Sequence, residues 1–227
     1  GGAIYAKTSL SIEAEDPSTS YVFSKNSVST GKAQTTGQIA GGAIYSPSVT
    51  LNCQTVFSGN SASMATTNPP SGTSPKDTIG GAIAGTTISL SKTSHFSENT
   101  ADLGAAIGTL SGGSSSNLTE KITLSNGSFT FEKNKANKRG VIYAPSVSIK
   151  GNNITFNQNT STHDGSAIYF TKDATIESLG SVLFTGNNVT AEQASSTATG
   201  GQTTNTTNYG AAIFGDPGTQ TTDTTLK

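Results

Sequence analysis

Two short motifs alternate along this chain of 227 residues, and their alternation decides what it can fold into. One is Gly-Gly-Ala-Ile with its variants, present in seven copies, and the other is Phe-x-x-Asn, present in six. Strict alternation from end to end indicates an array of one repeated structural unit. The intact copies of the first motif are Gly1-Gly2-Ala3-Ile4, Gly41-Gly42-Ala43-Ile44 and Gly80-Gly81-Ala82-Ile83, and looser copies begin at Gly104, Arg139, Gly165 and Gly210. The copies of the second motif are Phe23 with Asn26, Phe57 with Asn60, Phe96 with Asn99, Phe131 with Asn134, Phe156 with Asn159, and Phe184 with Asn187.

The length of one unit selects the architecture. Gly41 and Phe57 are 16 residues apart and Asn99 precedes Gly104 by five, so one unit has about two dozen residues. Each unit contains short runs in which apolar residues alternate with Ser or Thr, which is the pattern of a β-strand. A propeller blade needs ~40 residues, so we predict an all-β, right-handed parallel β-helix (β-solenoid) of about 6–7 coils. It spans residues 1–214 as one domain, and residues 215–227 form a polar tail or linker.

The motif residues have structural roles in such a coil. Stacked isoleucines and phenylalanines are expected to form apolar ladders inside it, and the glycines to permit a tight corner. The asparagine tolerates a left-handed turn conformation, and asparagines stacked on successive coils can pair with each other or with the backbone. On this interpretation both motifs build the rod and perform no chemistry themselves.

Four segments depart from the strand pattern. They are residues 27–40, 61–79, 111–117 and 188–208. Three of them, all except 111–117, fall between the second motif and the next glycine pair, so we expect them to leave one common edge. Loops on a rigid scaffold often carry function. Disordered spacers are the alternative.

Composition excludes several classes of protein. The net charge is −1 and Arg139 is the single arginine, so nucleic acid is not expected as a partner. No apolar run approaches the length of a membrane-spanning helix, and no signal peptide is visible. Because the chain opens inside a repeat, we expect it to be a fragment of something longer. Cys53 has the same parity as Leu51 and Phe57, which predicts a small buried side chain.

Charged residues gather in the slot just before each glycine pair. This slot holds Asp77, Asp102, Lys138 with Arg139, and His163 with Asp164. Stacked coils would align these residues as a solvated charge ladder, with contact to a glycan or a cation as the alternative. A polysaccharide lyase or hydrolase would need carboxylates that converge on one face. His95 and His163 lie in different slots without a third ligand at metal spacing, so no metal or cofactor is expected.

One basic patch stands out, formed by Lys133, Lys135, Lys138 and Arg139. Charge could bind a sulfated glycan there, and a solvated turn is the alternative. The acidic cluster of Glu13, Glu15 and Asp16 is interpreted as a solvated turn. Tryptophan is absent, so sugar stacking would fall to an exposed tyrosine ladder. Its candidate members are Tyr5, Tyr45, Tyr143 and Tyr169.

Tandem Gly-Gly-Ala-Ile and Phe-x-x-Asn in a chain rich in Ser, Thr and Asn resembles the passenger domain of the chlamydial polymorphic membrane proteins. The resemblance covers Gly1 to Phe214 and departs from the motif at Arg139-Gly140-Val141, Ser166, Ala105 and Ala211. It implies an autotransporter passenger that is displayed on the bacterial surface or outer membrane. Contact with a membrane is then expected only through a C-terminal barrel outside this sequence.

The resemblance also implies a function. It predicts a segment of an adhesin that attaches to host epithelial cells through a receptor protein or a glycan, and it implicates the two motifs in adhesion. The alternatives are a structural stalk or antigenic decoy without a receptor of its own and, third, a carbohydrate-active β-helix enzyme. We predict no enzymatic activity. Exposed strand edges at the two ends predict self-association through the coil ends.

Overall fold

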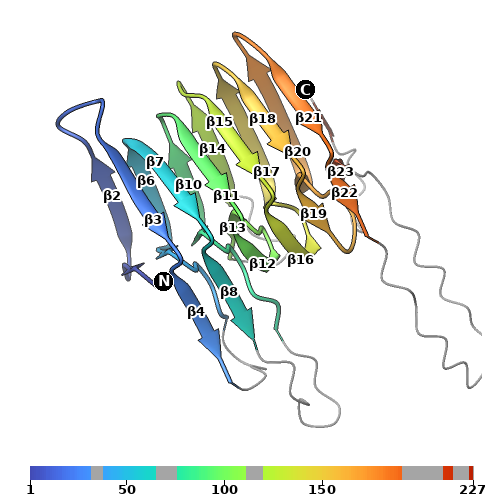
Figure 1. Cartoon of the computed structure of the whole chain (residues 1–227), viewed down its shortest axis with the longest axis horizontal. Coiled ribbons are helices and arrows are strands. Elements are labelled where there is room, and N and C mark those ends of the chain that lie inside the picture. Colours follow the sequence, from blue (N-terminus) through green and yellow to red (C-terminus); the bar gives the residue numbers. More distant parts are fainter. Residues whose placement is uncertain (32–37, 65–75, 111–119, 191–211, 217–224, 227) are drawn as a thin grey trace, which may run out of the picture.

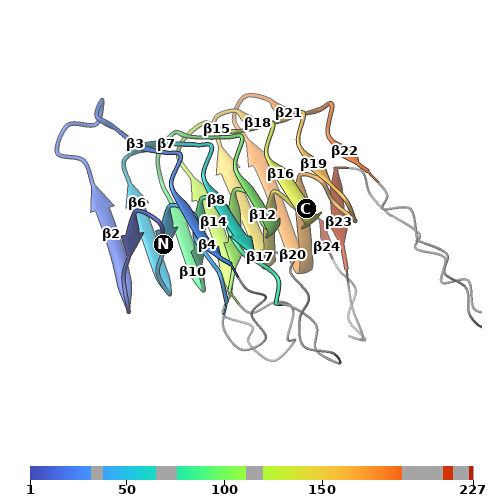
Figure 2. The same cartoon turned by 60° about the horizontal axis from the view of Figure 1, so that its bottom comes forward.

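In the computed structural model the chain winds into a parallel β-helix (Figure 1). The structure describes residues 1–31, 38–64, 76–110, 120–190, 212–216 and 225–226. Within these ranges there is no helix, and every strand pairing is parallel. Figures 1 and 2 show successive coils side by side along the long axis, from the blue N-terminal coil to the orange C-terminal ones. The predicted fold class is therefore confirmed.

The coils contribute strands to three sheets, which we call sheets A, B and C. Sheet A begins each coil with β1 (Ile4–Tyr5), β5 (Ile44–Tyr45), β9 (Ile83–Gly85) and β13 (Ile107–Thr109), and continues with β2 (Ser9–Glu13), β6 (Ser48–Asn52), β10 (Thr87–Leu90) and β14 (Lys121–Ser125). In the fifth and sixth coils the two parts are continuous, as β17 (Ile142–Gly151) and β20 (Ile168–Ser178). β23 (Ile213–Gly215) and β24 (Thr225–Leu226) both pair with β20.

Sheets B and C complete each coil. Sheet B contains β3 (Ser20–Ser24), β7 (Gln54–Ser58), β11 (Ser94–Ser97), β15 (Phe129–Glu132), β18 (Ile154–Asn157) and β21 (Val182–Thr185). Sheet C contains β4 (Ser27–Thr30), β8 (Ser61–Met64), β12 (Thr100–Leu103), β16 (Lys135–Arg139), β19 (Thr160–Ser161) and β22 (Asn188–Val189). The described residues thus form six full coils and the start of a seventh.

The interior consists of stacked identical side chains, as predicted. The motif isoleucines lie in register from β1 to β23. The motif phenylalanines form a continuous stack with neighbouring ring centroids 4.6–5.0 Å apart. This spacing matches the ~4.8 Å between neighbouring strands. Phenylalanines of the middle coils, such as Phe96, are fully buried, and Cys53 is buried in the same core.

An asparagine ladder runs beside the phenylalanines. Asn99, for example, donates from its backbone N–H and its side-chain Nδ2 to Oδ1 of Asn134, at 3.0 and 2.9 Å, and from Nδ2 to the carbonyl of Phe57 at 3.0 Å. Its own Oδ1 accepts the same pair of bonds from Asn60. Each buried amide therefore ties together three coils, and the predicted amide pairing is confirmed.

The left-handed position in the Phe-x-x-Asn motif differs from the prediction. The residue before each asparagine has the positive φ, as at Lys25, Glu98, Lys133 and Gln158, or is a glycine with positive φ. The asparagine instead turns its amide inward, where a buried hydrogen-bonding group needs a partner. The residue before the asparagine therefore makes the turn, and the hydrogen bonds of the asparagine amide hold that turn in place.

The first glycine of each described corner does adopt the left-handed conformation, with φ of 68° at Gly41 and 65° at Gly80. The second glycine has a different reason. A Cβ on Gly42 would lie 2.0 Å from the carbonyl oxygen of Gly81 in the next coil. The corner thus brings backbones of neighbouring coils into direct contact, and only glycine leaves room there.

Three further expectations need correction. Sheet C was not foreseen, because β4 and β8 lie in segments expected to depart from the strand pattern. At the fifth corner Gly140, with φ of 61°, and not Arg139, takes the left-handed position. In the segment 215–227, expected to be a tail or linker, β24 pairs with β20.

Parts of the four insertions fall outside the described residues, and the third, 111–117, does so entirely. Gly31, Met64 and Thr190 are the last described residues before the undescribed parts of the first, second and fourth, and each follows or ends a strand of sheet C. Their positions agree with the prediction that these three insertions leave the rod along one common edge. The flanks of the third, Leu110 and Glu120, instead lie between the two parts of sheet A.

Candidate functional site

A cleft of about 480 Å³ lies where sheet C turns into the next corner, and we call it the corner cleft. It draws residues from several coils, which the sequence separates by more than a hundred positions. Its lining consists of Gln38, Lys76, Asp77, Ile79, Leu103, Lys138, Arg139, Tyr143 and His163.

The floor of the cleft exists because an aromatic column is interrupted. Tyr5 stacks on Tyr45, and Tyr143 stacks on Tyr169, each pair with centroids 5.3 Å apart. Between these pairs the same position holds Ala84 and Gly108 in the third and fourth coils.

Two aliphatic side chains pack where the aromatic column is interrupted. Ile79 and Leu103, the residues before two corner glycines, are buried in a small apolar cluster with Ala84 and Tyr143. A Cβ on Gly108 would lie 2.7 Å from Cγ2 of Ile79, so this glycine makes room for the isoleucine. The result is a closely packed, buried apolar layer under the cleft, whose lining also holds charged side chains.

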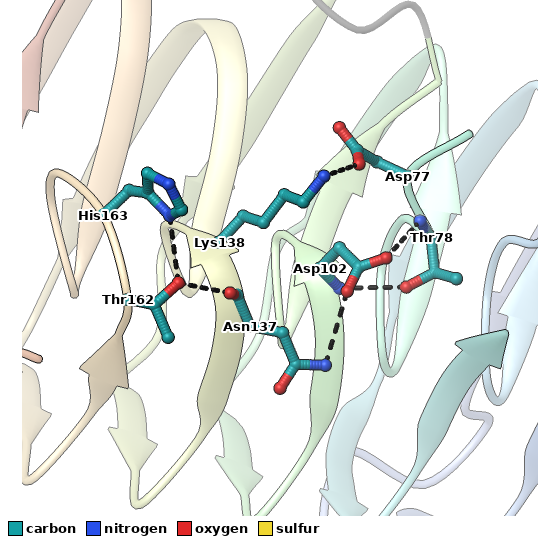
Figure 3. Close-up of polar contacts among 7 residues, drawn as sticks. All are labelled: Asp77, Thr78, Asp102, Asn137, Lys138, Thr162 and His163. Carbon is teal, nitrogen blue, oxygen red and sulfur yellow. Dashed lines mark hydrogen bonds and ion pairs between the residues drawn. The ribbon is translucent and has the colours of Figure 1, made fainter. Parts of the chain in front are cut away.

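The N-terminal wall is held by a reciprocal pair (Figure 3). The backbone N–H of Thr78 donates to Oδ2 of Asp102, and the backbone N–H of Asp102 donates to Oγ1 of Thr78, both at 2.9 Å. Asn137 adds a longer bond of 3.4 Å to the other carboxylate oxygen. The Asp102 carboxylate is thus largely used in holding neighbouring coils together.

Two ion pairs cross the cleft region between coils. Lys138 pairs with Asp77, whose side chains are 46% and 34% exposed. Arg139 Nε lies 3.9 Å from Oδ2 of Asp164, too far for a hydrogen bond, and this buried Nε has no hydrogen-bond acceptor. The guanidinium carbon sits 5.1 Å from the ring centroid of Tyr169, which holds the cation in place.

The C-terminal wall is formed by the next coil. Thr162 donates from its hydroxyl to the carbonyl of Asn137 and lies 2.9 Å from Nδ1 of His163. The backbone N–H of His163 donates to the carbonyl of Lys138 at 2.9 Å. His163 is therefore held by hydrogen bonds to the neighbouring coil and to Thr162, and it belongs to the lining of the cleft (Figure 3).

The slot before the glycine pairs is only partly the solvated ladder that was expected. Asp77, Asp102, Lys138, Arg139, His163 and Asp164 do come together, but ion pairs and hydrogen bonds connect them across coils. The same slot contains Ile79 and Leu103, so apolar and charged residues share one column.

The predicted basic patch divides in two. Lys138 and Arg139 line the corner cleft. Lys133 sits in the turn between β15 and β16 and pairs with Glu132 at 3.4 Å, and Lys135 is exposed outside the lining. Sequence reasoning missed Lys76 and Gln38, whose only signal is their place shortly before a corner.

The exposed tyrosine ladder is wrong as predicted. Tyr143 and Tyr169 are buried, and burial raises the pKa of both hydroxyls; for Tyr169 a hydrogen bond to Asp216 raises it further. Tyr5, by contrast, is exposed. The column is two separate stacks, and neither offers a continuous sugar platform.

The remaining candidate residues from the sequence lie outside the corner cleft. Hydrogen bonds from the Ser18 side chain and backbone lower the pKa of Asp16, which is an exposed turn residue. Burial raises the pKa of the Cys53 thiol. In the part of the chain that the structure describes, no group of three or more His, Cys, Asp and Glu side chains could hold a metal ion. The same residues include no helix long and apolar enough to cross a membrane.

Comparison with known proteins bears on the family. Residues 153–171 match the Chlamydia polymorphic membrane protein (Chlamydia_PMP) repeat. Over 96% of its length the chain is 74% identical to the probable outer membrane protein PmpB of Chlamydia trachomatis serovar D. The chain belongs to the chlamydial polymorphic membrane protein family. Over its whole length this Pmp segment is also 55% identical to the probable outer membrane protein PmpC of Chlamydia muridarum.

The Pmp relatives are far longer than this chain, which covers 13% of PmpB and 15% of PmpC. Their names describe outer membrane proteins, which supports the predicted localisation at the bacterial outer membrane and cell surface. No solved structure matches the chain.

Proposed function

We propose that this Pmp segment is part of a surface-displayed passenger that attaches the bacterium to host epithelial cells through a receptor protein or a glycan. The observation that carries the proposal is the corner cleft, an outward-facing site with a fixed lining that spans several coils. Membership of a family of outer membrane proteins supports display where a receptor could be met.

In this proposal the two family motifs act through folding. Their central copies are buried: Phe57 and Asn60, Phe96 and Asn99, Ala43 and Ile44 have no exposed surface. A receptor cannot touch such residues in the folded coil. Substituting them would reduce adhesion by disturbing the coils that shape the outer surface.

Many weak contacts can add up on a repeating rod. A long passenger built from such coils would present several sites at fixed spacing, and linked sites bind more tightly together than singly. Adhesion therefore does not require a deep pocket in any one coil.

The first test is binding of fluorescently labelled, monodisperse fragment to epithelial cells, with an unrelated β-helix protein as the control. We expect saturable binding that unlabelled fragment competes away. Binding no greater than that of the control β-helix would contradict a receptor site within these coils.

A structural stalk or antigenic decoy is the second candidate. The burial of both motifs favours it, since the most repeated residues of the chain serve the scaffold. Replacing residues 65–75 and 191–211 by short Gly-Ser linkers and substituting the cleft lysines separates the two functions. A stalk predicts that cell binding is absent from the start or unaffected by either change.

An enzyme finds little support at this site. The Asp102 carboxylate accepts bonds from Thr78 and Asn137, and Asp77 pairs with Lys138. Paired catalytic carboxylates need one member that remains available as acid or base. The named relatives are called probable outer membrane proteins, a description that includes no enzymatic activity.

A further inference from the structure

We propose that the corner cleft binds a sugar unit that carries a carboxylate or sulfate group. The inference rests on the proposed adhesive function and deepens it by naming the site and the class of ligand.

Charge in the lining favours an anion. Lys76, Lys138 and Arg139 are cations and Asp77 is the one carboxylate among the lining residues, so the formal charge of the lining is three minus one, or +2. The chain as a whole has a net charge of −1. A cationic cleft on a weakly acidic protein concentrates anions locally.

The cations are available to a ligand. Among the described residues no ion pair involves Lys76. Lys138 and Asp77 form an exposed pair, and exposed pairs are weak, so a ligand anion can replace Asp77 at little cost. Arg139 is 3.9 Å from Asp164 and 40% exposed, and Tyr169 holds its guanidinium in position.

The rest of the lining suits a hydroxylated ring better than a bare anion. Asp77 and Gln38 offer acceptors and an amide for hydroxyl groups, and His163 belongs to the same lining. Of the two aliphatic lining residues, Ile79 is fully buried and Leu103 keeps only a small exposed area that the C–H face of a sugar can meet. The volume, about 480 Å³, is typical of sites that hold one small ligand.

The site depends on a combination of features that the second coil lacks. One requirement is the interruption of the aromatic column at Ala84 and Gly108. The other is a nearby corner at which the residue before the glycine is a cation, Arg139. In the second coil Ala40 occupies the pre-glycine position and Tyr45 fills the column.

The experiment compares two double variants that remove the same charge from different places. Lys76→Ala with Lys138→Ala empties the cleft of two cations, and Lys133→Ala with Lys135→Ala removes two lysines from outside the lining. The probes are 3′-sialyllactose and a sulfated heparin-derived disaccharide, with lactose as the neutral control, measured by calorimetry or ligand-observed NMR. Thermal unfolding of each variant checks that the coil is intact.

We expect at least one anionic probe to bind the unmodified chain and lactose not to bind. The cleft variant should weaken that binding about tenfold or more, and the outside variant by less than about twofold. Equal losses in both variants would mean general charge attraction and would overturn the site. Lack of binding by either anionic probe would also overturn it.

Asp77→Asn provides a second variant that keeps the size of the side chain. It frees Lys138 from its ion pair, so an anionic probe should bind the variant at least as tightly as the unmodified chain. Weaker binding of both anionic probes would contradict the role given to Lys138.

Cell binding distinguishes the two proposals. If the fragment binds cells but neither anionic sugar binds the cleft, adhesion stands and this inference fails. If an anionic sugar binds the cleft but cells do not bind the fragment, the site stands and the adhesive function fails.

Discussion

The buried asparagines are the residues on which the coils depend most directly. Asn99 makes hydrogen bonds to residues of three other positions, Asn60, Asn134 and Phe57, in the coils on both sides. Asn99→Ala would remove the side-chain acceptor of the Asn60 backbone N–H and the side-chain donor to the Phe57 carbonyl, and would take one hydrogen bond from each of the Asn60 and Asn134 amides, in a dry interior. We expect a loss of roughly 3 kcal/mol in the free energy of unfolding, measured by urea titration.

Asn157 is a matched control for that substitution. It follows Phe156 on β18 and is half-buried on the outer face, where water replaces lost contacts. Asn157→Ala should change the free energy of unfolding by less than about 0.5 kcal/mol. Similar losses for Asn99 and Asn157 would show that the ladder contributes no special stability.

The phenylalanine stack makes a second prediction at this scale. Phe96 is fully buried between Phe57 and Phe131, whereas its neighbour His95 points to the outer face of the same strand. Phe96→Ala should lower the free energy of unfolding by about 3–5 kcal/mol through the cavity it leaves. His95→Ala, followed in the same urea titration, should be nearly silent.

The two buried tyrosines predict sensitivity to alkali. Burial raises the pKa of Tyr143 and Tyr169 in the folded state above the value of 10.0 expected when unfolded. The folded state therefore retains these protons longer, so their contribution is complete below pH ~10 and is lost as the pH rises beyond it. The urea concentration at the midpoint of unfolding should be lower at pH ~11 than at pH ~9. Tyr143→Phe with Tyr169→Phe should reduce that fall, and an unchanged slope would refute the assignment.

At the scale of the element, the corner depends on two glycines for two reasons. Gly80 provides the left-handed conformation, and Gly81 leaves space for the carbonyl of Ala105, which lies 2.1 Å from where its Cβ would be. Gly81→Ala should therefore cost roughly 2 kcal/mol or more, as overpacking against a backbone does.

The same position holds an alanine in the fourth coil, Ala105, and the chain tolerates it. There the next corner is shorter, since Gly140 precedes its isoleucine by two residues where Gly104 does so by three. Ala105→Gly should thus cost no more than ~1 kcal/mol, the usual entropic cost of glycine. Comparing the two variants by thermal unfolding tests whether the neighbouring corner decides what fits.

The strands of sheets A and B could be predicted from the sequence because many of their inward-facing side chains are large and apolar. Sheet C was not, since its inward residues are small: Ala62, Ala101 and Ala136 are buried where the other sheets place isoleucine or phenylalanine. Alternation of alanine with serine or threonine is a weak strand signal. The shifted corner at Gly140 was equally hidden, because it depends on an extra residue in β16, where the pairing with β12 changes register.

At the scale of the whole molecule, the fold could be predicted but the site could not. The period of the repeat is a local property and survives in sequence. The corner cleft depends on residues from Gln38 to His163 that meet only after stacking, and on the absence of side chains at Ala84 and Gly108. The slot before the glycine pairs was the one usable signal, and it located Asp77, Lys138 and His163 correctly.

The stacking also predicts uneven stability along the rod. Core residues of the central coils, such as Ile88 and Ile122, are fully buried, whereas Leu10 in the first coil is half-buried. In the sixth coil Leu179 is 92% exposed. Repeat arrays open from their weaker units, so amide hydrogen exchange should be slowest in β10, β11 and β14 and faster in β2 and β21. Uniform protection would mean that the coils open only together.

The direction of the hydrogen bonds has a mechanical consequence. Every strand runs across the rod, so the bonds between coils lie parallel to its long axis, and the asparagine amides lie along the same direction. A pull on the two ends loads these bonds in line and opens them a few at a time, as a zipper opens. Each released coil of about two dozen residues would lengthen the chain by about 80 Å. Under the proposed adhesive function, a rod of this kind would yield to a sudden drag coil by coil while its outermost contact stays in place.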